Sequence, residues 1–198
     1  MSKRGPGRPP AFDRTQVLDT VMRVFWRKGY AAASMPDISA ATGLSTSSLY
    51  NTYGSKLDLL VAALDHYHRT WLQGVMLGPM VRGERGLADL EEFLDRLESA
   101  LEPVRARGCL AVNTIAEFRD PPAPVAEQTA RYRALLRAGL HAALSRAAIH
   151  GEIPAGSVES RTDSLVPMVL AFNLLVAAHA PAQESRDLLR AARAMARA

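Results

Sequence analysis

The chain has 198 residues, of which 48% are hydrophobic and 22% charged, and its formal net charge is +4. This length and apolar content allow a buried core, and they suit a small domain beside a larger one. The sequence has no apolar run of 18 residues, so we expect no membrane span, and no apolar stretch follows Met1–Arg4, so we expect no signal peptide. Its one cysteine, Cys109, has no partner for an intrachain disulfide, which fits a cytoplasmic location.

Positive charge is concentrated towards the N-terminus. Residues 1–60 hold eight of the 24 Lys and Arg residues but only four of the 20 Asp and Glu residues, whereas residues 61–198 are neutral overall. Clustered Lys and Arg raise affinity for phosphate by releasing counterions, without sequence preference. The charge therefore favours a nucleic-acid partner. A membrane is disfavoured, because no basic amphipathic helix accompanies the charge.

Residues 1–12 form a basic arm that is expected to be flexible. The Gly and Pro residues between Lys3 and Pro10 prevent a helix or a strand. An extended arm of this kind is slim enough to lie in the minor groove of DNA, where the negative potential attracts Arg4 and Arg8. A disordered, soluble tail is the alternative that the residues leave open.

Residues 13–55 predict three helices. The first, at about 13–28, begins with the capping box of Asp13 and Gln16 and stops at Gly29. Apolar residues recur along it at helical spacing, so one face is expected to be buried.

The second and third helices are very short and are separated by a glycine turn. Ser34 and Asp37 form a capping box, and Gly43 stands where a C-cap glycine belongs. Ser45 or Thr46 then caps the third helix. Helices this short bury too little surface to stand alone, so the pattern predicts a helix-turn-helix supported by its neighbours.

The third helix presents small or flat hydrogen-bonding groups. Such groups suit the major groove, where base edges offer donors and acceptors. The exposed set is expected to be Thr46, Ser47, Ser48, Tyr50, Asn51 and Thr52. Two surface helices of an ordinary all-α protein are the alternative reading.

Five stretches in this order resemble the DNA-binding domain of the tetracycline-repressor (TetR) family of bacterial transcriptional regulators. They are Phe25-Trp26-Arg27-Lys28-Gly29-Tyr30, Ser34-Met35-Pro36-Asp37-Ile38, Gly43-Leu44-Ser45, Ser48-Leu49-Tyr50 and Lys56-Leu57-Asp58-Leu59-Leu60. The resemblance implies a three-helix DNA-binding head, an all-α ligand-binding body, a homodimer, and repression of a promoter that a small molecule relieves. No cofactor or metal is expected, and the sequence has no nucleophile elbow, phosphate loop or suitable pair of carboxylates that would indicate an enzyme.

The resemblance also indicates which residues meet DNA. The family usually has His then Phe near the end of the recognition helix, where this chain has Thr52 and Tyr53, so the contact made by Thr52 is open. Hydroxyl groups donate or accept, so specificity is expected to lean on DNA shape. The expected contacts on a palindromic, double-stranded operator are Arg4, Arg8, Ser34, Ser45, Thr46, Ser47, Ser48, Tyr50, Asn51, Thr52 and Lys56.

Residues 56–198 predict an all-α ligand-binding and dimerisation domain, for about nine helices in the whole chain. A capping box of Ser55 and Asp58 opens it. The segment from Leu165 to Ala178 is apolar on more than one side, so either the core or a partner helix could bury it. The resemblance implies that the last two helices pack against those of a second copy. The expected helices are about 56–77, 84–106, 109–118, 122–149, 158–179 and 184–197, with Pro167 kinking or weakening one turn.

A pocket for a small apolar or aromatic effector is expected among the helices of this domain. Asn113 and Glu117, four residues apart on a short apolar helix, are candidate polar anchors, and interhelix hydrogen bonds are the alternative for them. The expected lining residues are Trp71, Met76, Cys109, Asn113, Glu117, Phe118, Tyr132, Phe172 and His179.

Cys109 supports a second hypothesis, a thiol-based repressor that senses oxidants or electrophiles. Arg105 and Arg107 lie near it in sequence and would favour the thiolate, but no second cysteine is present to resolve a sulfenic acid. A buried structural cysteine is the preferred alternative. An enzyme is a distant alternative. His66 and His68, two apart on a helix, point in different directions and so do not predict a metal site.

Overall fold

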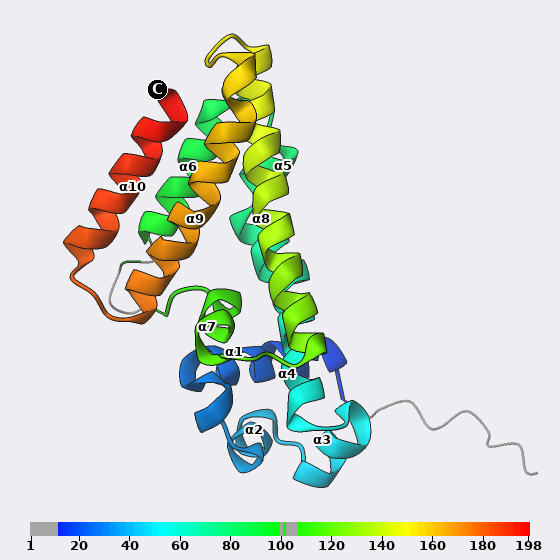
Figure 1. Ribbon diagram of the computed structural model, residues 1–198. Coiled ribbons are helices and arrows are strands. Elements are labelled where there is room, and N and C mark those ends of the chain that lie inside the picture. The colour runs from blue at the N-terminus through cyan, green and yellow to red at the C-terminus, as the bar shows by residue number, and fades with distance from the viewer. Residues whose placement is uncertain (1–11, 100, 102–106) are drawn as a thin grey trace, which may run out of the picture.

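The computed structural model describes residues 12–99, 101 and 107–198, and within this part of the chain every regular element is a helix. Helix α1 (Arg14–Ala32), α2 (Met35–Thr42) and α3 (Thr46–Tyr53) form the head, at the bottom of Figure 1. The expected all-α fold with a helix-turn-helix head is confirmed.

The short helices of the head form because each end is capped locally. The Ser34 hydroxyl accepts the Asp37 N–H at 3.2 Å while the Asp37 carboxylate accepts the Ser34 N–H at 3.0 Å. Gly43, with a φ of 71°, adopts the left-handed conformation and donates its N–H to the Ser39 carbonyl. Ser45 caps α3 by accepting the Ser48 N–H. The capping predictions for these helices are confirmed.

Two helices differ in part from the prediction. Gly29 interrupts α1 where a stop was expected, because its backbone leaves the helical conformation (φ 76°, ψ 171°), but one further turn follows to Ala32. The single helix expected at 56–77 is α4 (Lys56–Tyr67) followed by the π-helix η1 (His68–Met76). A π-helix is rare and often lies at a functional site, and hydrophobic periodicity does not signal it.

The body above the head contains the remaining helices. Those after η1 are α5 (Gly78–Arg82), α6 (Leu87–Ser99), α7 (Leu110–Glu117), α8 (Ala123–Ile149), the 3₁₀ turn η2 (Ala155–Ser157), α9 (Val158–Ala177) and α10 (Ala182–Arg197). The described residues therefore hold ten α-helices against about nine expected. The extra one is α5, which begins with Pro79 in its first turn. Helix α9 continues through Pro167.

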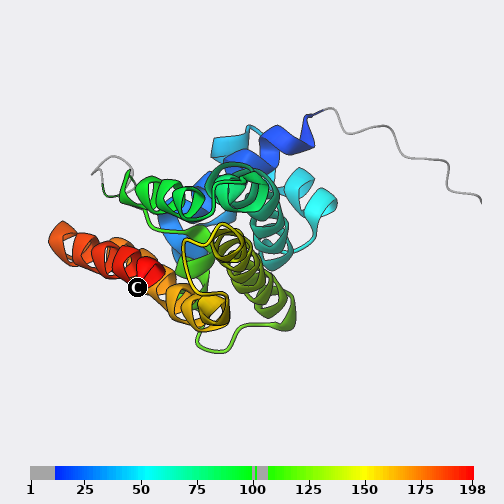
Figure 2. The same ribbon diagram turned by 90° about the horizontal axis from the view of Figure 1, so that it is seen from above.

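Head and body share one core. Figure 1 shows α8 and α9 side by side above the head, with α10 on the outer side of α9 and α7 between the head and the body. Figure 2, seen from above, shows the body helices grouped over α1 and α4. The core runs without a break from Phe25 in α1 through Leu64 in α4 to Phe172 in α9. A change in the body can therefore reach the head through packed side chains.

Candidate DNA-binding surface and effector cavity

Helix α3 is held to the head by one side and exposed on the other. Leu49 is fully buried and Tyr53 packs partly against the core. Ser45, Ser47, Tyr50 and Asn51 are exposed, and Thr46, Ser48 and Thr52 are half-buried. Tyr50 and Asn51 are therefore on the free side of α3, whereas Thr46, Ser48 and Thr52, expected to be exposed, are only partly so. Their contacts with DNA remain a prediction.

Ser34, Tyr50 and Lys56 are the expected phosphate anchors, and Ser34 and Lys56 have different surroundings. Ser34 is exposed at the N-terminus of α2, where backbone N–H groups favour an anion. The ammonium of Lys56 lies 4.5 Å from the centre of the Tyr30 ring and 3.4 Å from the Ala31 carbonyl oxygen. Lys56 is therefore held at the junction of α1 and α4, with its charge beside the recognition unit.

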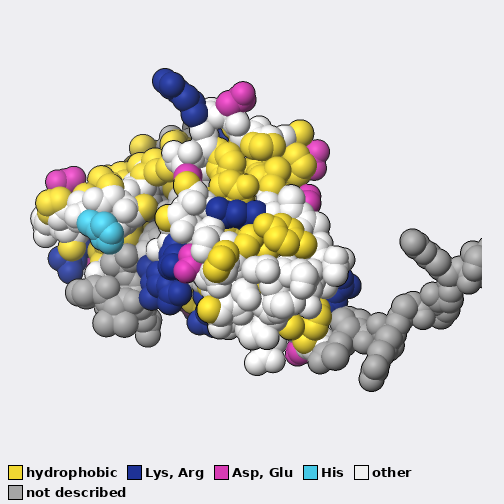
Figure 3. Space-filling view, turned by 90° about the horizontal axis from the view of Figure 1, so that it is seen from below, with side chains coloured by type: hydrophobic (Ala, Val, Ile, Leu, Met, Phe, Trp, Pro, Cys, Tyr) yellow, Lys and Arg dark blue, Asp and Glu magenta, His cyan; other side chains and the backbone are white. Residues whose placement is uncertain are grey.

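The charged side chains of the head lie outside α3. No charged side chain occurs in α3 from Thr46 to Tyr53. Lys28 pairs with Asp37 at 2.7 Å, which neutralises one positive charge and holds α1 to α2. In Figure 3 the Lys and Arg side chains gather around a largely white surface on the underside of the molecule. Arg4 and Arg8 lie outside the described residues, so the role of the arm remains a prediction.

A cavity of about 750 Å³ lies between the head and the body. Aromatic rings form much of its wall: Trp26 comes from α1, Tyr67 from α4, Trp71 from η1, Phe93 from α6 and Tyr132 from α8. The Trp26 ring makes edge contacts with Tyr67 at 5.3 Å and with Trp71 at 5.5 Å between ring centroids. Such a space suits a small molecule with a flat, apolar body.

Four of the nine predicted ligand residues line this cavity: Trp71, Met76, Cys109 and Tyr132. The other five do not. Phe172 is a core residue with 1% exposure, Phe118 packs against the Tyr30 ring, and His179 is exposed after the end of α9.

The two expected polar anchors are engaged elsewhere. The Asn113 amide donates to the Arg107 carbonyl oxygen at 2.8 Å. The Glu117 carboxylate accepts the backbone N–H groups of Tyr30 and Ala31 at 2.8 and 2.6 Å. Both residues satisfy backbone groups near their own helix, so the expectation that they anchor a ligand in this cavity is corrected.

Sequence reasoning missed the contribution of the head to the cavity. Met22, Arg23 and Trp26 of α1 all line it, although the pocket was expected only within residues 56–198. A signal was present, because Met22 and Trp26 extend the apolar stripe of α1 beyond the width that a three-helix head needs. Arg96 and Asn173, from α6 and α9, add polar groups that the sequence pattern did not single out.

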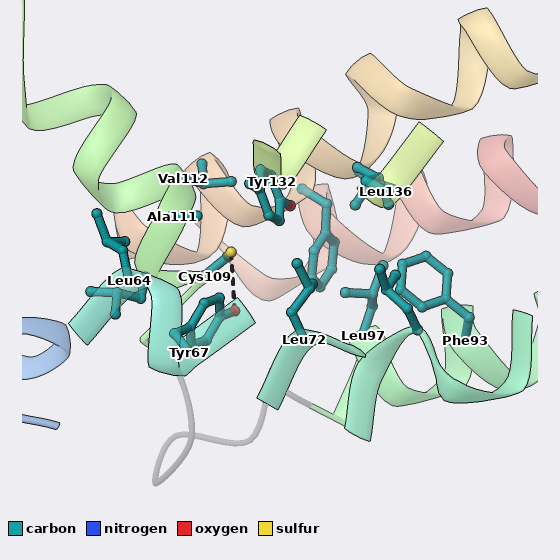
Figure 4. Close-up of a cluster of buried hydrophobic side chains, with 14 of the residues drawn as sticks. Leu64, Tyr67, Leu72, Phe93, Leu97, Cys109, Ala111, Val112, Tyr132 and Leu136 are labelled. Carbon is teal, nitrogen blue, oxygen red and sulfur yellow. Dashed lines mark hydrogen bonds between the residues drawn. The ribbon is translucent and has the colours of Figure 1, made fainter. Parts of the chain in front are cut away.

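Cys109 lies in the cavity wall but is only 6% exposed. Its thiol shares a hydrogen bond with the Tyr67 hydroxyl at 3.2 Å, as the dashed line in Figure 4 shows, and Tyr132 lies on the other side. Burial raises the pKa of the Cys109 thiol above its ordinary value. The raised pKa disfavours the thiolate that a fast thiol sensor needs.

These features define the class of the molecule. A helix-turn-helix head shares its core with a helical body, and a cavity of ligand size lies where the two meet. That arrangement is typical of a DNA-binding regulator that also binds an effector. In the part of the chain that the structure describes, no helix is long and apolar enough to cross a membrane.

The chain belongs to the TetR family. Residues 17–63 match the family model described as bacterial regulatory proteins, tetR family, and residues 86–197 match that of the tetracyclin repressor-like C-terminal domain. The protein is accordingly a DNA-binding transcriptional regulator and not an enzyme.

Similar proteins agree with this assignment. The chain is 29% identical over 147 residues to the uncharacterized HTH-type transcriptional regulator YezE of Bacillus subtilis, covering 74% of this chain and 76% of YezE. It is 43% identical over 65 residues to the HTH-type transcriptional repressor ComR of Escherichia coli, covering 33% of this chain and 31% of ComR. The fold matches a cysteine mutant of the TetR family regulator CifR solved with 26 bp operator DNA, with a TM-score of 0.79 and 23% identity over 94% of this chain and 98% of CifR.

Proposed function

We propose that this protein is a dimeric repressor that binds a palindromic operator in the bacterial cytoplasm and leaves it when a small apolar or aromatic molecule occupies the cavity. The observation that carries the proposal is the cavity of about 750 Å³, walled by aromatic residues of both the head and the body. A ligand there touches α1 and α4 at once. It can therefore favour one placement of the head over another, which is the requirement for release.

The dimer follows from the helix-turn-helix and from α9 and α10. One head covers half an operator, and two heads must reach major grooves that are roughly 34–36 Å apart. On α9 and α10, Leu174 and Met195 are 43% and 40% exposed although both are large and apolar. Exposed apolar side chains on two adjacent helices suit a contact with the same helices of a second copy.

The direct test selects a duplex from a random DNA pool with the wild-type protein and then titrates that duplex with and without aromatic compounds. We expect a two-fold symmetric site and its release by at least one compound. Trp71→Ala should weaken the response to that compound and leave the affinity for DNA unchanged. An asymmetric site bound by one protomer would refute the dimeric repressor.

The second candidate is a thiol-based response, because Cys109 lies in the same cavity wall. The raised pKa of the Cys109 thiol and its hydrogen bond with Tyr67 make this hypothesis weaker than that of a reversibly bound effector. Cys109→Ser separates the two. If the variant keeps its response to the aromatic compound and the wild type ignores peroxide, the thiol is structural.

A further inference from the structure

Helix α7 is attached to helix α1 of the head at both of its ends. Before its first residue, the carbonyl oxygen of Gly108 accepts the indole N–H of Trp26 at 3.1 Å. At its last residue, the Glu117 carboxylate accepts the N–H groups of Tyr30 and Ala31. Figure 1 shows α7 lying on α1 between the head and the body. A movement of α7 must therefore change at least one of these two attachments.

Gly29 makes the second attachment possible. Its positive φ of 76° interrupts α1 and turns the next two N–H groups towards α7. A Cβ at this position would lie 3.1 Å from the nearer Glu117 oxygen, and the positive φ would be strained for any other residue. The carboxylate acts as a cap for the last turn of α1, and a charged acceptor makes both bonds stronger than neutral ones.

The contact between Glu117 and the last turn of α1 lies next to the helix-turn-helix in sequence. Ala33 follows the last turn of α1, and Ser34 then caps α2. Lys56, the first residue of α4, contacts both the Tyr30 ring and the Ala31 carbonyl oxygen. The two residues that Glu117 holds are therefore the residues against which α4 begins.

The first attachment belongs to the cavity. Trp26, Gly108 and Cys109 all line it, and the Trp26 ring contacts Tyr67 and Trp71 inside it. A ligand that inserts between these rings has to move the Trp26 indole, and the bond to Gly108 depends on the position of that indole.

We propose that Glu117 is a positioning residue that transmits occupancy of the cavity to the helix-turn-helix. Displacement of Trp26 breaks its hydrogen bond to Gly108 at the start of α7. The helix then shifts, and the hydrogen bonds from Tyr30 and Ala31 to Glu117 break. The start of α2 and the base of α4 are then free to take another orientation. The inference rests on the proposed effector response, and it adds a path through α7 to the direct one along α4.

The test compares Glu117→Gln with Glu127→Gln, which removes the same charge from an exposed position near the start of α8. Hydrogen exchange of the Tyr30 and Ala31 amides is measured first, without any ligand. An amide side chain offers one acceptor oxygen where the carboxylate offers two, so we expect faster exchange in Glu117→Gln only. We also expect its affinity for the selected duplex to fall roughly ten-fold. If the Tyr30 and Ala31 amides exchange at the wild-type rate in both variants, the inference is overturned.

The second part uses the aromatic dye 8-anilinonaphthalene-1-sulfonate as the probe. Dye binding, followed by fluorescence, should persist in Glu117→Gln and be tighter than in the wild type, because Glu117 does not line the cavity and occupancy no longer has to break its bonds to Tyr30 and Ala31. In the wild type the dye should speed amide exchange at Tyr30 and Ala31 and weaken DNA binding. In Glu117→Gln both changes should be much smaller. If the dye changes amide exchange and DNA affinity in the wild type and does so equally in Glu117→Gln, the inference is overturned.

Failure of the proposed function has a different signature. If the dye binds in the wild type but leaves its DNA affinity unchanged, the effector response fails, while the ligand-free exchange still decides the role of Glu117. Trp26→Phe checks the other end of α7, because it keeps a six-membered ring in the cavity and removes the N–H donor to Gly108. Faster exchange at Tyr30 and Ala31 is expected there too, and an unchanged rate contradicts transmission through α7.

Discussion

His68 leads to a quantitative prediction about acid stability. It is the first residue of η1 and has no exposed surface, and its ring stacks on Tyr132 with centroids 6.4 Å apart. Neither ring nitrogen has a hydrogen-bond partner among the described residues. Burial, reinforced by the nearby charge of Arg131 and only partly offset by Asp65 and the Gln128 side chain, lowers the pKa of His68 from 6.5 to about 4.

The sign follows from linkage. In the unfolded chain His68 takes up a proton below pH 6.5, whereas in the folded protein it stays neutral until about pH 4. The unfolded state therefore binds more protons in this window, and stability falls as the pH falls from 6.5 to 4. At roughly 1.4 kcal/mol for each pH unit, the total loss is about 3 kcal/mol.

The assay is urea unfolding at a fixed protein concentration, at half-unit steps between pH 7.5 and 4. His68→Phe keeps an aromatic ring against Tyr132 and removes the titration, so its stability should vary by about 3 kcal/mol less across the window. His150→Gln, at the exposed end of α8, serves as the control and should follow the wild type. A His68→Phe profile as steep as that of the wild type would refute the reasoning.

Four further outcomes are expected. Tyr50→Ala and Lys56→Ala should each weaken operator binding by roughly 1 to 3 kcal/mol without changing the dimer, and unchanged gel-shift affinity for both would remove α3 from the DNA surface. Deletion of residues 1–10 should flatten the dependence of log affinity on log salt, and an identical slope would make the arm a passive tail. Leu174→Glu should give monomers by sedimentation, since each dimer would bury two unpaired charges; Val176 does not test this, because at 4% exposure it belongs to the protomer core. Asp37→Asn should lessen the loss of stability as the pH falls below 3.8, because the bonds from Lys28 and Ser34 hold the pKa of the Asp37 carboxyl well below that value in the folded state.

The local architecture of the head was predictable from sequence because its determinants act over three or four residues. The capping boxes of Ser34 with Asp37 and of Ser55 with Asp58 formed where the spacing predicted them. The left-handed Gly43 did so as well. Bonds of this range depend on residue type and spacing alone, so no knowledge of the tertiary fold was required.

The body shows where this reasoning stops. Apolar periodicity located its helices but did not distinguish α4 from the π-helix η1, because both bury residues at similar spacings. Trp71 and Tyr132 were recognised as large rings, yet core packing and ligand contact need the same side chains. Only the fold separates Phe172, which fills the core, from Phe93, which lines the cavity.

By itself the sequence determined the helices of the head, the caps of α2 and α3 and the family. The tertiary structure decided what each long-range polar group meets. Glu117 was recognised as a carboxylate that needed a partner, but its partners are the N–H groups of Tyr30 and Ala31, 87 and 86 positions away along the chain. Backbone donors are the same at nearly every residue and leave no mark in the sequence. Their use is settled only when Gly29 turns two of them towards a helix that the fold has brought alongside.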